Sequence, residues 1–118
     1  MHTEFGKYVR DRREARCIAD RRYSVRRVAQ RLGVQPSYLS KVERGEVGPP
    51  SEETTRRLAE DLGEDADVLL ALAGKVSSDL REVILKRPRL FADLLRQLKD
   101  APDHAVLRVV REVRDGTW

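Results

Sequence analysis

The sequence has little of the residue types on which several large classes of protein depend. Its 118 residues include one cysteine, one methionine, one tryptophan and two histidines. A single cysteine cannot form an internal disulfide, so the sequence gives no sign of an oxidising compartment. Closed zinc sites use four cysteine or histidine ligands, and three such residues do not supply them. We therefore expect no metal and no cofactor.

Long apolar runs and strand patterns are also missing. No apolar run approaches the ~18 residues of a membrane span, and the first residues lack the character of a signal peptide. Few segments combine β-branched residues with strict alternation, so we expect almost no strand. These absences favour a cytoplasmic, all-α protein that does not engage a membrane.

The sequence contains no recognisable catalytic motif. Neither a phosphate-binding loop nor a G-x-G-x-x-G segment is present. His2 and His104 have no H-E-x-x-H context and no partner at the spacing of a catalytic triad. Cys17 stands alone near a predicted helix end, where a cysteine usually has no chemical role. We expect no catalytic residue and no enzymatic activity.

Charge is abundant and unevenly distributed. The chain has 24 basic residues, 19 Arg and 5 Lys, against 20 acidic ones, for a net charge of +4. Residues 1–48 hold 12 basic and 6 acidic residues, whereas residues 49–118 hold 12 and 14. The arginine fork suits phosphates and base edges. The first half is therefore a candidate surface for a polyanion, and a solvated charged face is the alternative.

Helical periodicity runs through the whole chain. Ser24 and Ser51 stand where N-caps are expected, and Gly33 and Gly63 where helices end. Residues 17–23 are either a charged connection or an extension of the first helix. The pattern predicts five helices in the first 74 residues: 4–16, 25–32, 36–44, 52–62 and 66–73. Three short amphipathic segments follow: 80–86, capped by Ser78, then 88–98 and 103–113.

The most informative stretch is Ser24 to Gly45, which reads SVRRVAQRLGVQPSYLSKVERG. Its apolar positions predict two helices that meet around a short turn, a geometry in which the second helix projects its first residues into a DNA groove. The exposed side of that second helix carries hydrogen-bonding groups and no acid, because Glu43 falls on the far side of the first turns.

The segment from Phe5 to Gly74 resembles the Cro/CI-type (XRE) helix-turn-helix domain. The resemblance rests on VAQRLGV, PSYLSKVERG, a proline-containing loop and TTRRLAEDLG. It implies a five-helix lambda-repressor-like DNA-binding domain over residues 1–74, followed by a short helical dimerisation element over 75–118. Two features depart from the family pattern. The link at 17–23 is longer than usual, and Gln35 replaces the common Ser or Thr cap.

The resemblance also implies which residues contact double-stranded DNA. Lys41 is the leading candidate for a guanine contact, and Arg44 matches a phosphate-clamping position. Tyr38 has an alternative role in packing. Arg10, Arg13, Arg26 and Arg27 either extend the basic surface or are merely solvated. The expected DNA-binding residues are Gln35, Pro36, Ser37, Tyr38, Ser40, Lys41, Arg44, Ser24, Arg26 and Arg27.

One such domain covers too few base pairs for useful specificity, so two copies are expected on a palindromic operator. The apolar stripes of residues 75–118 are the candidate dimerisation element, and folding back onto the same subunit is the alternative. The last helix and Trp118 fit either arrangement. The expected dimerisation residues are Leu80, Val83, Ile84, Leu90, Phe91, Leu94, Leu95 and Leu98.

These expectations together describe a nucleoid-associated homodimeric repressor that regulates its own operon. A second resemblance, based on layout and the segment LFADLLRQL, is to compact repressors of phage-defence and stress operons. In that group an ImmA/IrrE-type zinc metallopeptidase inactivates the repressor by cleaving its tail. The alternative function is an antitoxin whose tail binds a toxin protein. A protein-interaction scaffold without DNA binding is a third reading, which the acid-free second helix disfavours.

Overall fold

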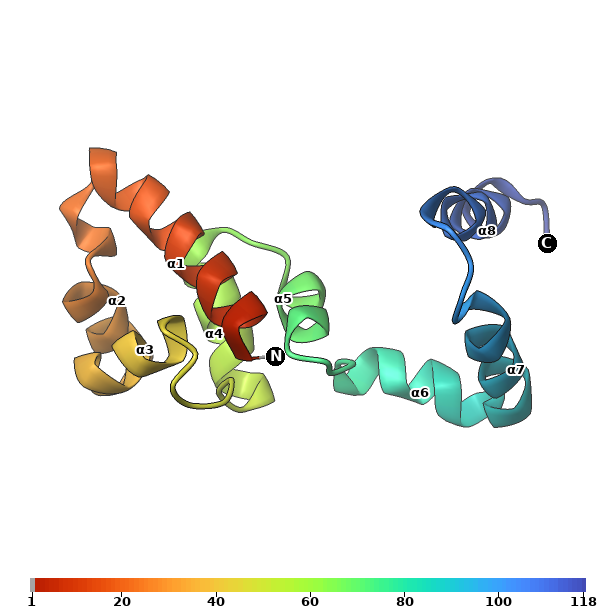
Figure 1. Ribbon diagram of the computed structural model, residues 1–118, viewed down its shortest axis with the longest axis horizontal. Coiled ribbons are helices and arrows are strands. Elements are labelled where there is room, and N and C mark those ends of the chain that lie inside the picture. The colour runs from red at the N-terminus through yellow and green to blue at the C-terminus, as the bar shows by residue number, and fades with distance from the viewer. Residues whose placement is uncertain (1) are drawn as a thin grey trace. The chain divides into compact units, whose positions relative to one another are not determined.

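The computed structural model describes residues 2–118, with side chains from Glu4 onward, and contains helices but no strand over that range. The expected all-α fold is therefore confirmed. The chain separates into two compact units, one that ends at Ser77 and one that spans Ser78–Trp118 (Figure 1). Within the described residues, no helix is both long enough and apolar enough to cross a membrane.

The first unit contains the five predicted helices and one additional short element. The segment at 17–23 is partly an extension of the first helix and partly a connection. The first helix continues to Ala19, and a single 3-10 turn then leads to the second helix. The elements are α1 (His2–Ala19), η1 (Arg21–Tyr23), α2 (Val25–Leu32), α3 (Pro36–Glu43), α4 (Glu52–Leu62) and α5 (Ala66–Leu72).

Local signals set the limits of these helices. The Ser24 hydroxyl accepts the backbone N–H of Arg27 at 3.2 Å, which caps α2. The helix ends at Gly33, whose φ of 72° lies in the left-handed region that glycine adopts without strain. Pro36 occupies the first turn of α3, as the sequence predicts, and Gln35, which replaces the common Ser or Thr, forms no side-chain cap hydrogen bond.

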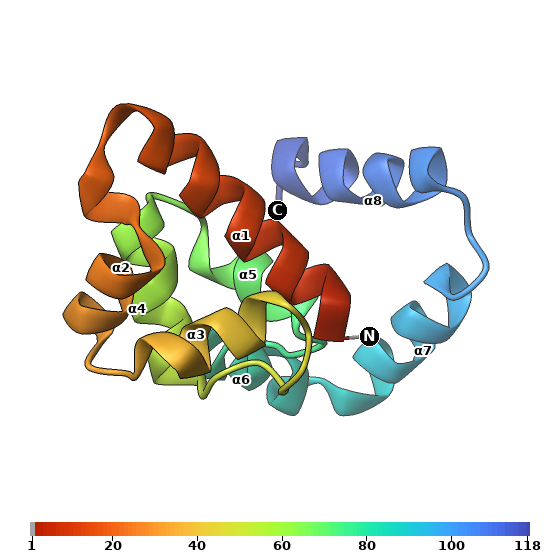
Figure 2. The same ribbon diagram turned by 60° about the vertical axis from the view of Figure 1, so that its left-hand side comes forward.

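The core of the first unit is formed by side chains from all five helices, and α1 packs against α3, α4 and α5 (Figure 2). The close approach of α1 and α3 requires a glycine. A Cβ atom at Gly6 would lie 2.3 Å from the carbonyl oxygen of Val42 and 2.7 Å from that of Glu43. The buried apolar side chains are Phe5, Val9, Val28, Ala29, Leu32, Leu39, Val42, Leu58, Ala59, Leu62, Leu69 and Leu70.

A buried ion pair joins α1 to the end of α3. The Arg13 guanidinium donates to both carboxylate oxygens of Glu43, at 2.7 and 2.9 Å, and to the carbonyl oxygen of Tyr23 at 3.2 Å. The hydrogen bond to Glu43 raises the pKa of Arg13, against the opposing effect of burial. The expectation that Arg13 extends the basic surface is wrong, because this side chain lies inside the fold.

The second unit is a succession of three helices: α6 (Ser78–Lys86), α7 (Pro88–Leu98) and α8 (Asp103–Asp115). They follow one another around an open arch (Figure 2). Ser78 is the first residue of α6 rather than a cap that precedes a helix at residue 80. No residue between 78 and 118 is buried in this structure.

We predict that Glu43→Gln destabilises the first unit by about 3–5 kcal/mol, because it leaves the Arg13 charge buried without a counter-charge. Urea unfolding followed by circular dichroism measures the effect. The double variant Arg13→Met/Glu43→Leu should recover most of the loss, since it removes both charges. The control is Arg10→Ala, which breaks the exposed pair with Glu14 and should cost less than about 0.5 kcal/mol. Equal losses in the Glu43 variant and the control would contradict the assignment.

Candidate nucleic-acid interface

The candidate interface is the outward face of α3 together with the start of α2. Leu39 and Val42 of α3 are buried, so the opposite side of the helix faces outward. Because Glu43 is also buried against α1, that outward face carries no carboxylate. Gln35, Pro36, Ser37, Lys41 and Arg44 are exposed, and Ser40 and Tyr38 are half-buried.

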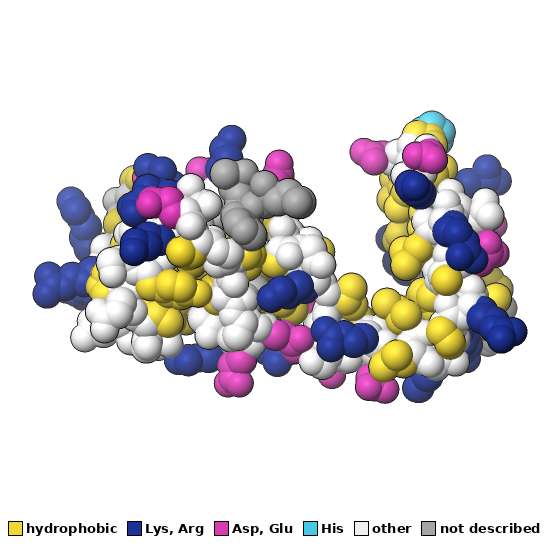
Figure 3. All heavy atoms as spheres, turned by 60° about the horizontal axis from the view of Figure 1, so that its bottom comes forward, with side chains coloured by type: hydrophobic (Ala, Val, Ile, Leu, Met, Phe, Trp, Pro, Cys, Tyr) yellow, Lys and Arg dark blue, Asp and Glu magenta, His cyan; other side chains and the backbone are white. Residues whose placement is uncertain are grey.

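The basic side chains around this face differ in their partners. In the described part of the chain, Lys41, Arg26 and Arg27 form no ion pair and are exposed. Arg44 instead pairs with Glu46, and both of these side chains are about half exposed. Lysine and arginine side chains project from the α2–α3 end of the first unit (Figure 3). This end therefore offers cations whose charge is not already neutralised.

Tyr38 lies at the rim of the core rather than on the open face. Its ring is half-buried and packs against the buried cluster. Tyr38 therefore has the packing role that the sequence offered as its alternative. A contact between its hydroxyl and DNA stays a prediction.

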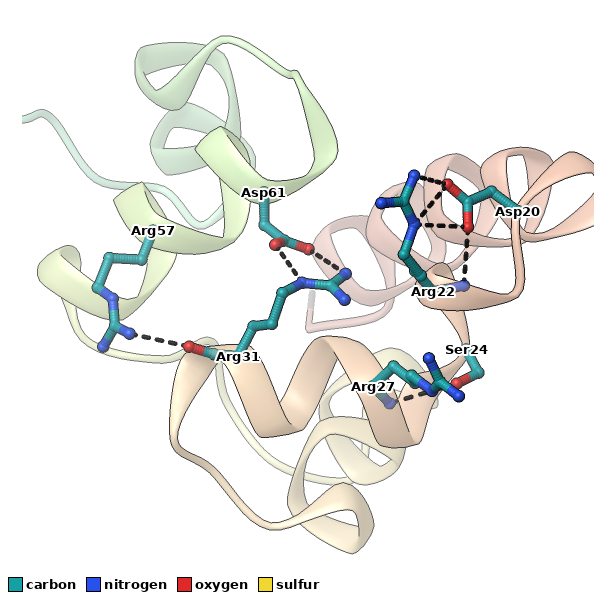
Figure 4. Close-up of polar contacts among 7 residues, drawn as sticks. All are labelled: Asp20, Arg22, Ser24, Arg27, Arg31, Arg57 and Asp61. Atoms are coloured by element: carbon teal, nitrogen blue, oxygen red, sulfur yellow. Dashed lines mark hydrogen bonds and ion pairs between the residues drawn. The ribbon is translucent and has the colours of Figure 1, made fainter.

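The connection between α1 and α2 is tightly held. Asp20 accepts the backbone N–H of Arg22 at 3.0 Å and pairs with the Arg22 guanidinium at 2.8 Å (Figure 4). These hydrogen bonds lower the pKa of Asp20 to about 2. The Tyr23 ring lies under the guanidinium groups of Arg16 and Arg31, 5.5 and 5.3 Å from its centroid. The unusually long link is therefore an ordered element.

A second set of contacts holds the far end of α2 (Figure 4). Arg31 pairs with Asp61 of α4 at 2.7 Å. Arg57 of α4 donates to the carbonyl oxygens of Arg31 at 3.1 Å and Leu32 at 3.3 Å, two of the groups that a helix end leaves without intrahelical partners. Both ends of α2 are thus tied to neighbouring elements, which sets the orientation of the turn that leads into α3.

Sequence reasoning missed these contacts for different reasons. An Asp two residues before the backbone N–H that it accepts is a known local turn signal, and Asp20 could have been identified in this way. The pair between Arg31 and Asp61 has no such signal, because the two residues lie far apart along the chain. No group of three or more His, Cys, Asp or Glu suited to a metal ion is found among the described residues.

Comparisons with known proteins agree with this geometry. A family model described as a helix-turn-helix domain matches residues 4–72. Two relatives are each named an uncharacterized HTH-type transcriptional regulator, from Mycobacterium tuberculosis strains CDC 1551 / Oshkosh and ATCC 25618 / H37Rv. Each is 34% identical over 84 residues, which cover 68% of this chain and 56% of the relative. The chain thus spans about half the length of these relatives. No solved structure matches it significantly.

We predict that the Asp20 carboxyl titrates near pH 2, because Arg22 stabilises its charged form. Since the folded pKa lies below the unfolded one, the contribution of Asp20 to stability is present above about pH 4 and lost as the pH falls through 2. Carboxyl NMR shifts measure the titration. In Arg22→Ala the pKa should return toward about 3.9, whereas the control Arg21→Ala should leave it unchanged. An ordinary pKa in the parent protein would rule out the pair.

Proposed function

Because the chain belongs to the helix-turn-helix domain family, we propose that it is a sequence-specific DNA-binding transcriptional repressor that acts as a homodimer on its own operon. The observation that carries this proposal is the outward face of α3, which is polar, free of carboxylates and flanked by unpaired cations. Double-stranded DNA combines phosphates with base edges that donate and accept hydrogen bonds, and such a face suits both.

Within this proposal, residues 1–74 form the DNA-binding domain and α3 enters the major groove. Lys41 donates to a guanine, while Gln35, Pro36, Ser37, Tyr38 and Ser40 contact base edges or adjoining phosphates. Ser24, Arg26, Arg27 and Arg44 contact the phosphate backbone. Arg44 must exchange its pairing with Glu46 for a phosphate, so its contribution is smaller than that of an unpaired arginine.

Two copies on one palindrome account for useful specificity, since one domain reads only a short half-site. Residues 75–118 are proposed to hold the copies together through the stripe that runs from Leu80 to Leu98. Repression is the simpler mode of action, because it requires only that the protein occupy promoter DNA. Activation would need an additional contact with the transcription machinery.

A second candidate function is an antitoxin that binds a toxin protein through its tail and regulates its own operon through DNA. The observation that favours it is the absence of any buried residue between 78 and 118, since a segment without a core of its own can fold on a partner. This candidate predicts a monomer with a poorly folded tail when the protein is alone, whereas the repressor predicts a stable dimer.

Relief of repression by a separate metallopeptidase is a further proposal. Lys75 and Val76, near the end of the first unit, are exposed. Cleavage in the region 75–100 would separate the DNA-binding domain from the proposed dimerisation helices and weaken operator binding. An intact chain under inducing conditions would contradict this route.

We predict that Lys41→Ala weakens operator binding by about 5- to 150-fold for each copy bound, equivalent to ~1–3 kcal/mol, and relaxes the preference at one base pair in each half-site. Footprinting of the purified protein on its upstream region identifies the operator, and fluorescence anisotropy then measures the affinity. The matched control is Lys75→Ala, an exposed lysine outside the interface, which should bind like the parent. Full affinity in the Lys41 variant would show that α3 does not read the bases as assigned.

Removal of a phosphate contact should have a different signature. We predict that Arg27→Ala weakens binding to every DNA sequence by a similar factor, and lowers the slope of log K against log salt by about 0.9 for each copy bound. Titrations at several salt concentrations, on operator and on unrelated DNA, measure both effects. Lys75→Ala again serves as the control. A change confined to the operator would mean that Arg27 contacts a base rather than a phosphate.

A further inference from the structure

The candidate interface carries no carboxylate, but one lies directly beyond the end of α3. Glu46 follows that helix by three residues and pairs with Arg44, and each of these two side chains is 51% exposed. Apart from this pair, the Glu46 side chain forms no hydrogen bond or ion pair with the described residues. Its only such partner in that part of the chain is therefore an arginine that the proposed function places at the DNA backbone.

The backbone at the end of α3 fixes the position of Glu46. Gly45 has a φ of 74°, in the left-handed region. Its N–H donates to the carbonyl oxygen of Val42 at 3.1 Å, and the N–H of Glu46 donates to that of Lys41 at 2.9 Å, which is the Schellman arrangement of a helix end. Val47 then packs against the buried core. The backbone of Glu46 is therefore held on both sides.

Stability does not explain an acid at this position. An exposed pair between an arginine and a carboxylate contributes little to folding, and a negative charge beside the C-terminus of a helix opposes the helix dipole. Asp20 is different, because its carboxylate accepts the backbone N–H of Arg22 at 3.0 Å as well as pairing with that side chain. The Glu46 carboxylate accepts no backbone N–H among the described residues. Its charge is therefore available to act on a bound molecule.

We propose that Glu46 cancels the charge of Arg44 at the DNA backbone and thereby limits the affinity of this protein for DNA of any sequence. The inference rests on the DNA binding of the proposed function and adds a residue that restrains it. A guanidinium has five N–H donors, so Arg44 can contact a phosphate and Glu46 together. The end of α3 then meets the backbone as a neutral pair. Lys41, Arg26 and Arg27, which have no acidic partner among the described residues, each bring a full positive charge.

The neutral pair acts through the counterions of DNA. Binding without sequence preference comes essentially from cations that neutralise phosphates and release the ions around them. A helix end without net charge adds nothing to that release. Recognition of an operator also uses contacts with base edges, and these do not involve Glu46. The acid therefore limits binding to unrelated DNA while the contacts to bases stay in place.

The first test is the full-length variant Glu46→Gln, which keeps the size of the side chain and removes its charge. Fluorescence anisotropy at several salt concentrations measures its affinity for an unrelated duplex and for the footprinted upstream DNA. We expect both affinities to rise by a similar factor, roughly 3- to 10-fold for each copy bound at low salt. The slope of log K against log salt should become steeper by about 0.9 for each copy. Urea unfolding should show the stability of the parent.

Two further variants separate a charge effect from a structural one. Arg44→Gln leaves the acid unpaired at the backbone, so it should weaken binding and make the salt slope shallower by about 0.9 for each copy. The double variant Arg44→Gln/Glu46→Gln is neutral at both positions, as the parent pair is in sum, and should restore the slope of the parent. A disturbed helix end would instead weaken binding in all three variants without this cancellation.

The matched control is Asp115→Asn. Asp115 pairs with Arg114 at the end of α8, and the side chains of the arginine and the acid are 63% and 65% exposed. The substitution removes the same charge from the second unit, so it reproduces the change in net charge without altering the first unit. The affinity should change by less than about 2-fold, because salt screens exposed charges that do not contact the DNA.

Three results would overturn the inference. Affinity and salt slope like those of the parent in the Glu46 variant would mean that the carboxylate does not act at the backbone. A loss of affinity confined to the upstream DNA would mean that Glu46 accepts a hydrogen bond from a base. An equal gain in the Asp115 control would reduce the effect to net charge. Footprinting keeps the proposed function separate: if the parent protects no upstream site, sequence-specific binding fails, while the unrelated duplex still measures the role of Glu46.

Discussion

The buried ion pair between Arg13 and Glu43 is the constraint on which the first unit depends. A guanidinium enclosed by the fold needs a counter-charge and hydrogen-bond acceptors, and the carboxylate of Glu43 with the carbonyl of Tyr23 supplies them. One side chain thereby joins α1, the connection and the end of α3. The same pair keeps Glu43, the single acid of α3, away from the outward face of that helix. One ion pair therefore both joins α1 to α3 and leaves the candidate interface without a negative charge.

The orientation of α2 completes the site. Its first turn is capped by Ser24, and its last carbonyls accept hydrogen bonds from Arg57. Because both ends are held, the turn at Gly33 places the first residues of α3 at a defined angle to the core. The unpaired cations at the start of α2 and on α3 then lie on one end of the unit, where a phosphate backbone and a groove floor can be contacted together.

The two units meet the need for a core in different ways. The first buries its apolar side chains around Phe5 and Leu58 and leaves polar groups outside. The second also has apolar stripes, but none of its residues is buried. Each partly exposed leucine forgoes part of the ~1.5–3 kcal/mol that full burial provides, so any surface that covered these stripes would stabilise the second unit.

The sequence by itself determined the helices, the caps at Ser24 and Ser51, the turn at Gly33 and the residues that face outward from α3. These features arise from interactions within about four residues, which a linear pattern records. Only the tertiary structure decided that Arg13 is buried with Glu43, that Arg31 reaches Asp61, and that Gly6 permits α1 to approach α3. Those contacts join residues distant along the chain, and their partners are selected by how the helices pack.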